Sequence, residues 1–154
     1  MNKIGLNSEK AIALVRELND LLSNYQLFYM NVRGFHWNIK GANFFELHAK
    51  FEEQYDDLVI KVDEVAERVL TLGGVPTHTF EEYLKVSDIK AAHNITDGTE
   101  AIKSLLESFS ILITKQRNIL EAAGDAGDEG TGALMSDYIR EQEKLVWMYS
   151  AYLG

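Results

Sequence analysis

Hydrophobic side chains recur every three or four residues along four long stretches of the chain, which is the spacing of the buried face of an α-helix. We expect the first helix to begin after Ser8 as its N-cap. Its apolar face consists of Leu14, Leu18, Leu21, Tyr25, Phe28 and Val32. The apolar positions of the second stretch alternate spacings of four and three residues, and they are Phe51, Tyr55, Leu58, Val62, Val65, Val69 and Leu72. The first half of the chain therefore predicts two long amphipathic helices.

Capping signals mark the ends of the other predicted helices. Asn43, with a glutamate three residues later, predicts the start of the second helix, and the sequence Gly-Gly-Val-Pro at residues 73–76 predicts its end. Asp97, again with a glutamate three residues later, predicts the start of the third helix, which runs to Gly124. The fourth helix follows a glycine-rich turn, and its apolar positions are Leu134, Tyr138, Leu145, Met148 and Tyr152.

The connections between these helices indicate the fold. A short turn at Lys40 and Gly41 joins the first two helices, so they are expected to be antiparallel neighbours. A long crossover over residues 73–96 separates the second helix from the third, and residues 79–85 within it predict a short extra helix. One long central crossover is the ferritin-like arrangement. The sequence therefore predicts an all-α, ferritin-like four-helix bundle with a short extra helix in the crossover, forming a single domain over residues 1–154.

The composition agrees with a helical protein and excludes functions that depend on cysteine. Pro76 is the only proline, and the chain has no cysteine, which excludes disulfides, thiolate nucleophiles and cysteine-based zinc or iron–sulfur sites. No apolar run reaches the roughly 18 residues of a membrane span, and none near the N-terminus resembles a secretory signal. We therefore expect a cytoplasmic protein that makes no membrane contact.

The charge distribution favours cations as ligands. The net charge is −9, and the lysines and arginines are scattered without a run of three. Nucleic-acid binding normally requires clustered cations, so direct binding to DNA is not favoured. An acidic surface without a basic counterpart fits the handling of positively charged ions.

Five residues have the chemistry of a metal site: His36, His48, Glu52, Asp63 and Glu67. Imidazole and carboxylate ligands together suit iron, zinc or manganese. His48 and Glu52 share one helix face through i,i+4 spacing, and so do Asp63 and Glu67. Asp63 comes 15 residues after His48, which is about 22 Å along one helix, so the two pairs cannot bind the same ion within one chain. If they share an ion, the second pair belongs to another copy, as in a two-fold dimer.

Each part of this pattern also has a plainer explanation. An acidic i,i+4 pair on an exposed helix is usually solvated surface, and two histidines on either side of a turn are only suggestive. The Glu-x-x-His motif of intrasubunit di-iron bundles occurs nowhere in the sequence. Spacing alone therefore leaves metal binding open, and any iron site must be built differently from the one in those bundles.

Longer motifs closely resemble the Dps family, the mini-ferritins. The stretch His36–His48 reads HWNIKGANFFELH, Asp63–Arg68 reads DEVAER, and Leu72–Gly74 follows as LGG. The resemblance extends to Glu143–Met148, EKLVWM, and covers nearly the whole chain. It implies an inter-subunit ferroxidase centre between two-fold mates.

The resemblance also implies a role for each candidate ligand. His36 and His48 are expected to come from one chain, and Asp63 and Glu67 from its two-fold mate. These four residues are then both catalytic and metal-binding. Glu52 stands where the family usually has an acidic residue that supports the second metal position.

The activity implied by the family is oxidation of ferrous iron, two ions per site, with hydrogen peroxide preferred over dioxygen. Zinc can substitute for iron in such sites, and the ferric oxyhydroxide is stored in a hollow homo-dodecamer. Trp37 matches the family's tryptophan beside the centre and is a candidate for quenching radicals. Asp125, Asp128 and Asp137 are candidates for an iron-entry pore, although a common aspartate position of the family is Ala133 here.

Two other functions remain open. The main alternative is a nucleoid-associated protein that coats DNA, but members that do so directly often have a basic tail, and only Lys3 precedes the first predicted helix. Some relatives act on host immune cells, and no feature of the sequence supports or opposes such a role. His78 and His93 fall in the predicted crossover, where we expect exposed loop histidines.

Overall fold

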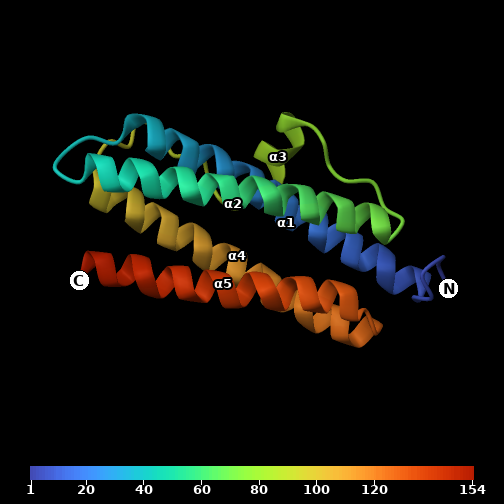
Figure 1. Ribbon diagram of the computed structural model, residues 1–154. Coiled ribbons are helices and arrows are strands. Elements are labelled where there is room, and N and C mark those ends of the chain that lie inside the picture. The colour runs from blue at the N-terminus through green and yellow to red at the C-terminus, as the bar shows by residue number, and fades with distance from the viewer.

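The protein is described over residues 1–154 by a computed structural model, which consists of five helices and no β-sheet. The helices are α1 (Ser8–Asn38), α2 (Phe44–Thr71), α3 (Phe80–Val86), α4 (Gly98–Ala126) and α5 (Glu129–Leu153). The four long helices lie side by side, and the short α3 sits on the flank of the bundle (Figure 1). The predicted all-α, ferritin-like bundle with an extra helix in the crossover is therefore confirmed.

The crossover returns the chain to the end of the bundle where α1 meets α2. Lys40, in the turn after α1, donates its backbone N–H to the carbonyl of Thr96 at 2.9 Å, just before α4 begins. As a result α2 and α4 run in the same direction, while α1 and α5 run in the opposite one (Figure 1). The N- and C-termini consequently lie at opposite ends of the bundle.

Two buried asparagines on α1 hold the crossover against the bundle. The Asn24 side-chain oxygen accepts hydrogen bonds from the backbone N–H groups of Asp88 and Ile89, each at 3.0 Å. Asn31, seven residues further along α1, accepts from the N–H of Ala92 at 2.9 Å. These side-chain oxygens accept from backbone N–H groups that form no helical hydrogen bond, so the crossover is held in place without regular secondary structure.

The start of each long helix tests the predicted caps. The N-cap of α1 is Asn7 and not Ser8, and its side-chain oxygen accepts from the N–H groups two and three residues later at 3.0 and 3.1 Å. Asn43 precedes α2 but makes no capping bond, because its backbone (φ −100°, ψ 22°) lacks the extended conformation of a capping residue; its amide nitrogen donates to the Tyr152 hydroxyl at 2.5 Å. Asp97 caps α4 as predicted.

The third predicted helix extends slightly further than expected. Gly124 lies inside α4, which continues to Ala126. The helix ends at Gly127, whose φ of 67° is left-handed and suits glycine. The helix therefore ends at Gly127, where the backbone is left-handed, and not at Gly124, where it is not.

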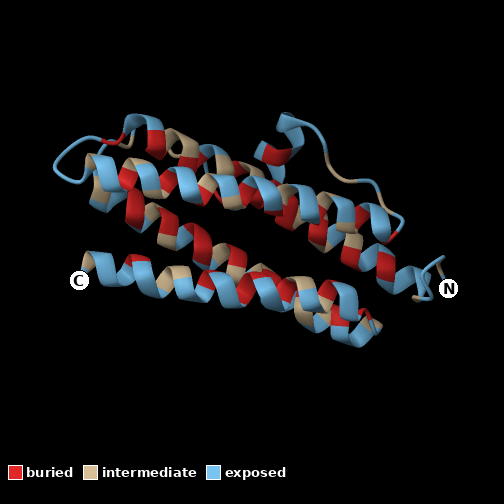
Figure 2. Cartoon of the chain, in the orientation of Figure 1, coloured by how far each residue is buried: buried red, intermediate tan, exposed pale blue.

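The core is one cluster of 28 buried hydrophobic residues. Phe28 and Phe109 meet edge to face at its centre, with ring centroids 5.1 Å apart. Figure 2 shows the buried positions as stripes on the inward faces of the long helices, with the outer faces exposed. The apolar stripe predicted for the first helix is entirely buried, whereas Tyr55 and Val62 of the second are only half-buried.

Candidate metal centre

Two histidines face each other where α1 ends and α2 begins. His36 lies in the last turn of α1 and His48 in the second turn of α2, so the short connection between the helices brings them together. Their imidazole rings stack with centroids 3.8 Å apart and an interplanar angle of 13°. His36 is buried and His48 is half-buried.

The ring nitrogens of this pair have separate tasks. Nδ1 of His36 lies 2.6 Å from the carbonyl oxygen of His48, and Nδ1 of His48 lies 2.8 Å from the carbonyl oxygen of His36. A carbonyl oxygen only accepts, so each Nδ1 carries a proton and donates it. In a neutral ring this leaves the Nε2 lone pair free to bind a metal and fixes the orientation of the ring, as is typical of metal-binding histidines.

Aromatic rings enclose the histidine pair. Phe44 stacks on His48 with centroids 5.0 Å apart, and Tyr55 meets His36 edge-on at 5.3 Å. Burial raises the pKa of the Tyr55 phenol, and the negative charge of Glu52 raises it further. The rings form an apolar wall beside the histidines, which limits the access of water and strengthens electrostatic interactions there.

The candidate carboxylates are spread along α2. Glu52 is exposed one helical turn after His48, on the same side of the helix. Asp63 and Glu67 are exposed near the other end of α2, and neither takes part in an ion pair within the protomer. Because α2 is one continuous helix, Asp63 and Glu67 lie about 22 Å or more from His48 along its axis. The protomer brings no three His, Asp or Glu side chains together in a way that could hold a metal.

The interior of the bundle contains neutral polar groups at the place where intrasubunit di-iron proteins have inward carboxylates and histidines. Gln142 donates to the Tyr25 hydroxyl at 2.7 Å, and Gln116 donates to the Gln142 carbonyl at 2.7 Å. Tyr25 completes the ring of hydrogen bonds by donating to Gln116. Because these groups already satisfy one another and include no carboxylate, the interior is a poor iron site.

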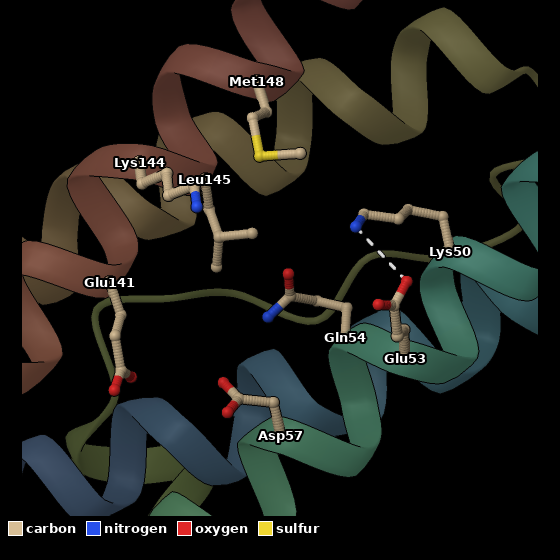
Figure 3. A pocket seen from close by; sticks show the side chains of 8 residues that line it. All are labelled: Lys50, Glu53, Gln54, Asp57, Glu141, Lys144, Leu145 and Met148. Atoms are coloured by element: carbon tan, nitrogen blue, oxygen red, sulfur yellow. Dashed lines mark hydrogen bonds and ion pairs between the residues drawn. The ribbon is translucent and has the colours of Figure 1, made fainter.

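A charged cluster lies beside this network, between α2 and α5. Lys61 is only 3% exposed, and its ammonium group lies 2.9 Å from both the Asp57 and the Glu141 carboxylates. Burial lowers the pKa of Lys61, but hydrogen bonds to the two carboxylates outweigh that effect and leave the pKa raised. Figure 3 shows Asp57 and Glu141 across the groove from each other, on α2 and α5. Both carboxylates are therefore already paired with one internal cation.

The three pore candidates have different surroundings. Asp128 is only 3% exposed, caps α5 by accepting from the Thr131 N–H at 3.0 Å, and pairs with Arg68 at 2.6 Å. Asp125 and Asp137 are exposed. The protomer thus gives the Asp128 carboxylate a structural role. A pore between protomers remains a prediction for all three residues.

Arg33 is a neighbour of the site that the sequence analysis did not single out. Its guanidinium lies 5.0 Å from the ring of Trp37 and 5.1 Å from that of Tyr55. The signal was present, because Arg33 precedes His36 by three residues and Trp37 by four, and such spacings share a helix face. His78 and His93 are exposed in the crossover, as expected.

Known proteins match this chain over nearly its whole length. The family model of the ferritin-like domain matches residues 15–154. The crystal structure of the Dps protein from Vibrio cholerae O1, described as a member of a broad superfamily of ferritin-like diiron-carboxylate proteins, has 58% sequence identity and a TM-score of 0.99, covering 100% of this chain and 97% of that one. The chain belongs to the Dps family. The family resemblance inferred from the motifs is therefore confirmed.

More distant members of the Dps family also match. The DNA protection during starvation protein of Porphyromonas gingivalis is 49% identical over 148 residues, covering 96% of this chain and 93% of the relative. A structure of Dps from Listeria innocua, soaked with zinc, is 28% identical with a TM-score of 0.88, covering 92% of this chain and 96% of that one. Membership of this ferritin-like family connects the chain with iron storage in general terms. No helix combines the length and the apolar character needed to cross a membrane.

Proposed function

We propose that this Dps-family protein binds ferrous iron between two-fold-related protomers, oxidises it as a ferroxidase, preferably with hydrogen peroxide, and stores the ferric oxyhydroxide in a hollow homo-dodecamer. His36 and His48 act with Asp63 and Glu67 of the partner subunit, and Glu52 supports the second iron position. The assembly works in the cytoplasm. Each two-fold interface carries two such sites.

The observation that carries this proposal is the reciprocal hydrogen bonding of the histidine pair. Both Nδ1 atoms are engaged by backbone carbonyls, so both Nε2 atoms remain available as ligands. The unpaired carboxylates of Asp63 and Glu67 are the complementary half of a mixed imidazole–carboxylate site. Because each half is about 22 Å from the other along α2, a second protomer must supply the missing half.

In this mechanism the chain positions two ferrous ions so that they act together. The hydrogen-bonded rings of His36 and His48 hold their lone pairs in fixed directions, and the carboxylates of the partner subunit favour the ferric product, which is a hard cation. Two ferrous ions supply the two electrons that reduce one peroxide without releasing hydroxyl radical. Exposed acidic residues then concentrate the ferric product before the mineral forms. Zinc, which prefers the same ligands, is expected to compete with iron for the site.

Stopped-flow oxidation of ferrous iron by peroxide tests the proposal. The double variant Asp63→Ala/Glu67→Ala is expected to lose the rapid phase while keeping the assembly size of the wild type in light scattering. The matched control is Glu107→Ala/Glu121→Ala, which removes two exposed carboxylates from α4 and is expected to keep the rapid phase. Undiminished rapid oxidation in the Asp63→Ala/Glu67→Ala variant would refute the proposed site.

We do not extend the proposal to DNA coating. The net charge of −9 opposes contact with phosphates, and lysines such as Lys61 and Lys115 are engaged in ion pairs within the protomer. In a gel-shift assay at low salt and neutral pH, the protein is expected to leave duplex DNA unretarded.

A further inference from the structure

A groove between α2 and α5 contains a buried amide with an unused hydrogen-bond donor. The groove has a volume of about 400 Å³, and none of the five candidate metal ligands lines it. Gln54 lies in the middle of the groove (Figure 3) and is only 4% exposed, yet its Nε2 has no hydrogen-bond partner. A buried N–H group without an acceptor is unfavourable. The groove is therefore suited to a ligand that brings an acceptor to Gln54.

Tyr149 determines which end of the Gln54 amide faces the groove. The buried Tyr149 hydroxyl donates to Oε1 of Gln54 at 3.2 Å and has no other partner within the protomer. Burial raises the pKa of this phenol, so the hydroxyl keeps its proton and needs an acceptor. The oxygen of the amide is therefore engaged by Tyr149, and the nitrogen is left to the groove.

Lysines already occupy most of the carboxylate oxygens in this groove. Both oxygens of Asp57 lie 2.9 Å from the Lys61 ammonium, which also lies 2.9 Å from Oε2 of Glu141. Glu53 pairs with Lys50 at 3.3 Å (Figure 3). A divalent cation would have to displace these lysines to gain a full set of ligands, so the groove is a poor metal site. Oε1 of Glu141 remains free as an acceptor.

Lys144 adds a positive charge that the protomer does not use. It is exposed on α5 and takes part in no ion pair. Lys144 lines the groove from α5 and Gln54 lines it from α2 (Figure 3). Two unused donors on opposite walls, one of them cationic, favour an anion that carries several oxygens.

We propose that this groove binds inorganic phosphate, whose oxygens accept from Gln54 Nε2 and from Lys144 while a P–OH group donates to Oε1 of Glu141. At neutral pH inorganic phosphate keeps at least one P–OH group, so it is acceptor and donor at once. A water takes about 30 Å³ of liquid volume, so the groove has room for this anion and several waters. The site is independent of the proposed ferroxidase function.

The free carboxylate oxygen of Glu141 makes the site selective among oxyanions. Sulfate has the shape of phosphate but no proton at neutral pH, so its oxygens would face that carboxylate without a hydrogen bond. A phosphate monoester loses its last proton at about pH 6, and a DNA phosphodiester has none to donate. The geometry therefore favours free phosphate over sulfate, monoesters and nucleic acid.

Equilibrium dialysis against radiolabelled inorganic phosphate at neutral pH tests the proposal. The assembled protein is first treated with a chelator, because residual ferric ions would themselves bind phosphate. We expect one bound phosphate per protomer. Unlabelled phosphate is expected to displace the label, whereas sulfate and glycerol phosphate are expected to need a concentration at least about tenfold higher, the effect of losing one hydrogen bond to a charged group.

Two variants remove the two donors separately. Lys144→Gln changes an exposed side chain without an ion pair, so folding is unaffected, and phosphate binding is expected to weaken about tenfold or more. Gln54→Glu keeps an oxygen for the Tyr149 hydroxyl but replaces the donor with a negatively charged oxygen, so binding is expected to be lost at unchanged assembly size in light scattering. Lys103→Gln, at an exposed position on α4, is the matched control and is expected to bind like the wild type.

A third variant tests the proton requirement. Glu141→Gln supplies an amide that donates to an oxyanion as well as accepts from one, so sulfate is expected to compete with phosphate nearly equally. Absence of phosphate binding in the wild type, or equal competition by sulfate there, would overturn the proposal. Wild-type binding in Lys144→Gln would also overturn it, because the phosphate would then lie elsewhere. None of these results bears on iron oxidation, which the Asp63→Ala/Glu67→Ala variant tests separately.

Discussion

Hydrogen bonds to backbone carbonyls determine what the two histidines can do. A histidine near a helix end can be a satisfied polar side chain, a charged surface group or a ligand, and residue type does not distinguish these. Here each Nδ1 donates to the carbonyl of the other histidine residue, so neither ring needs a further partner for that nitrogen. The same reciprocity ties the end of α1 to the start of α2. A metal bound at the Nε2 atoms would therefore meet ligands that are already oriented.

Asp128 shows how one carboxylate can match a functional motif and still have a structural task. It caps α5 and pairs with Arg68 at 2.6 Å while almost completely buried. Asp128→Asn keeps a good capping residue but removes the charge. We expect this variant to lose about 2–3 kcal/mol of unfolding free energy, measured by urea denaturation at fixed protein concentration, because Arg68 loses its partner.

The pore candidates provide the comparison for Asp128→Asn. Asp125→Asn and Asp137→Asn, at exposed positions, are expected to leave stability unchanged within about 0.5 kcal/mol. If a pore forms at these residues, the same two variants slow iron uptake into the assembly. A fully stable Asp128→Asn protein would mean that its ion pair makes no net contribution to folding.

Lys61 is the other residue whose charge the fold requires. Lys61→Met keeps the aliphatic stem but leaves Asp57 and Glu141 without their cation. Because these carboxylates are 44% and 50% exposed, water compensates in part, and we expect a loss of about 1–2 kcal/mol at pH 7. The exposed Lys103→Met, which breaks no ion pair within the protomer, is the control.

The pH dependence of the Lys61→Met effect has a definite sign. The pKa of Lys61 is raised in the folded protein, so its stabilising contribution is complete below the ordinary value of 10.5 and disappears as the pH rises through the folded value. The difference in stability between wild type and Lys61→Met is therefore expected to stay constant from pH 7 to about 10 and to shrink above 10.5. A constant difference through pH 12 would contradict this assignment.

At the scale of helices, periodicity and capping predict a large part of this fold. The regular apolar spacing gave both long helices of the first half, and the punctuation at residues 73–76 placed the end of α2. The exact caps were less certain. Asn7 and Ser8 are adjacent and chemically similar, and Asn43 caps nothing because its backbone is not extended. Its amide instead donates to Tyr152 on a distant helix. Contacts between remote segments decide such details, and one sequence does not record them.

The candidate site was predictable in composition but not in geometry. Spacing and motifs identified His36 and His48, yet their stacking and crossed hydrogen bonds depend on the path of the turn between α1 and α2. Arg33 was missed because a lone arginine on a helix is usually a solvated charge. Only the three aromatic rings around it, two on α1 and one on α2, distinguish it from such a residue.

The side chain of Asn24 holds the irregular crossover in place through its hydrogen bonds to Asp88 and Ile89. Asn24→Ala leaves the buried N–H of Ile89 and the part-buried N–H of Asp88 without their acceptor, at a cost of about 2–4 kcal/mol. Hydrogen exchange is expected to show faster exchange of these two amides, with α2 and α5 unaffected. Asn118→Ala, at an exposed position on α4, is the control. Unchanged protection at Asp88 and Ile89 would show that the amide of Asn24 does not hold the crossover.

At the scale of the assembly, the proposed function requires that neither protomer be sufficient by itself. His36→Ala/His48→Ala and Asp63→Ala/Glu67→Ala are each expected to abolish rapid iron oxidation when assembled alone. Co-assembled, they give mixed dimers in which the intact histidines of one protomer meet the intact carboxylates of the other at one of the two sites, while the second site lacks both halves. With random pairing half of the dimers are mixed, so an equal mixture is expected to recover about a quarter of the wild-type rapid phase in stopped-flow measurements. A site contained within one chain gives no recovery at any mixing ratio, because every protomer in the mixture is then defective.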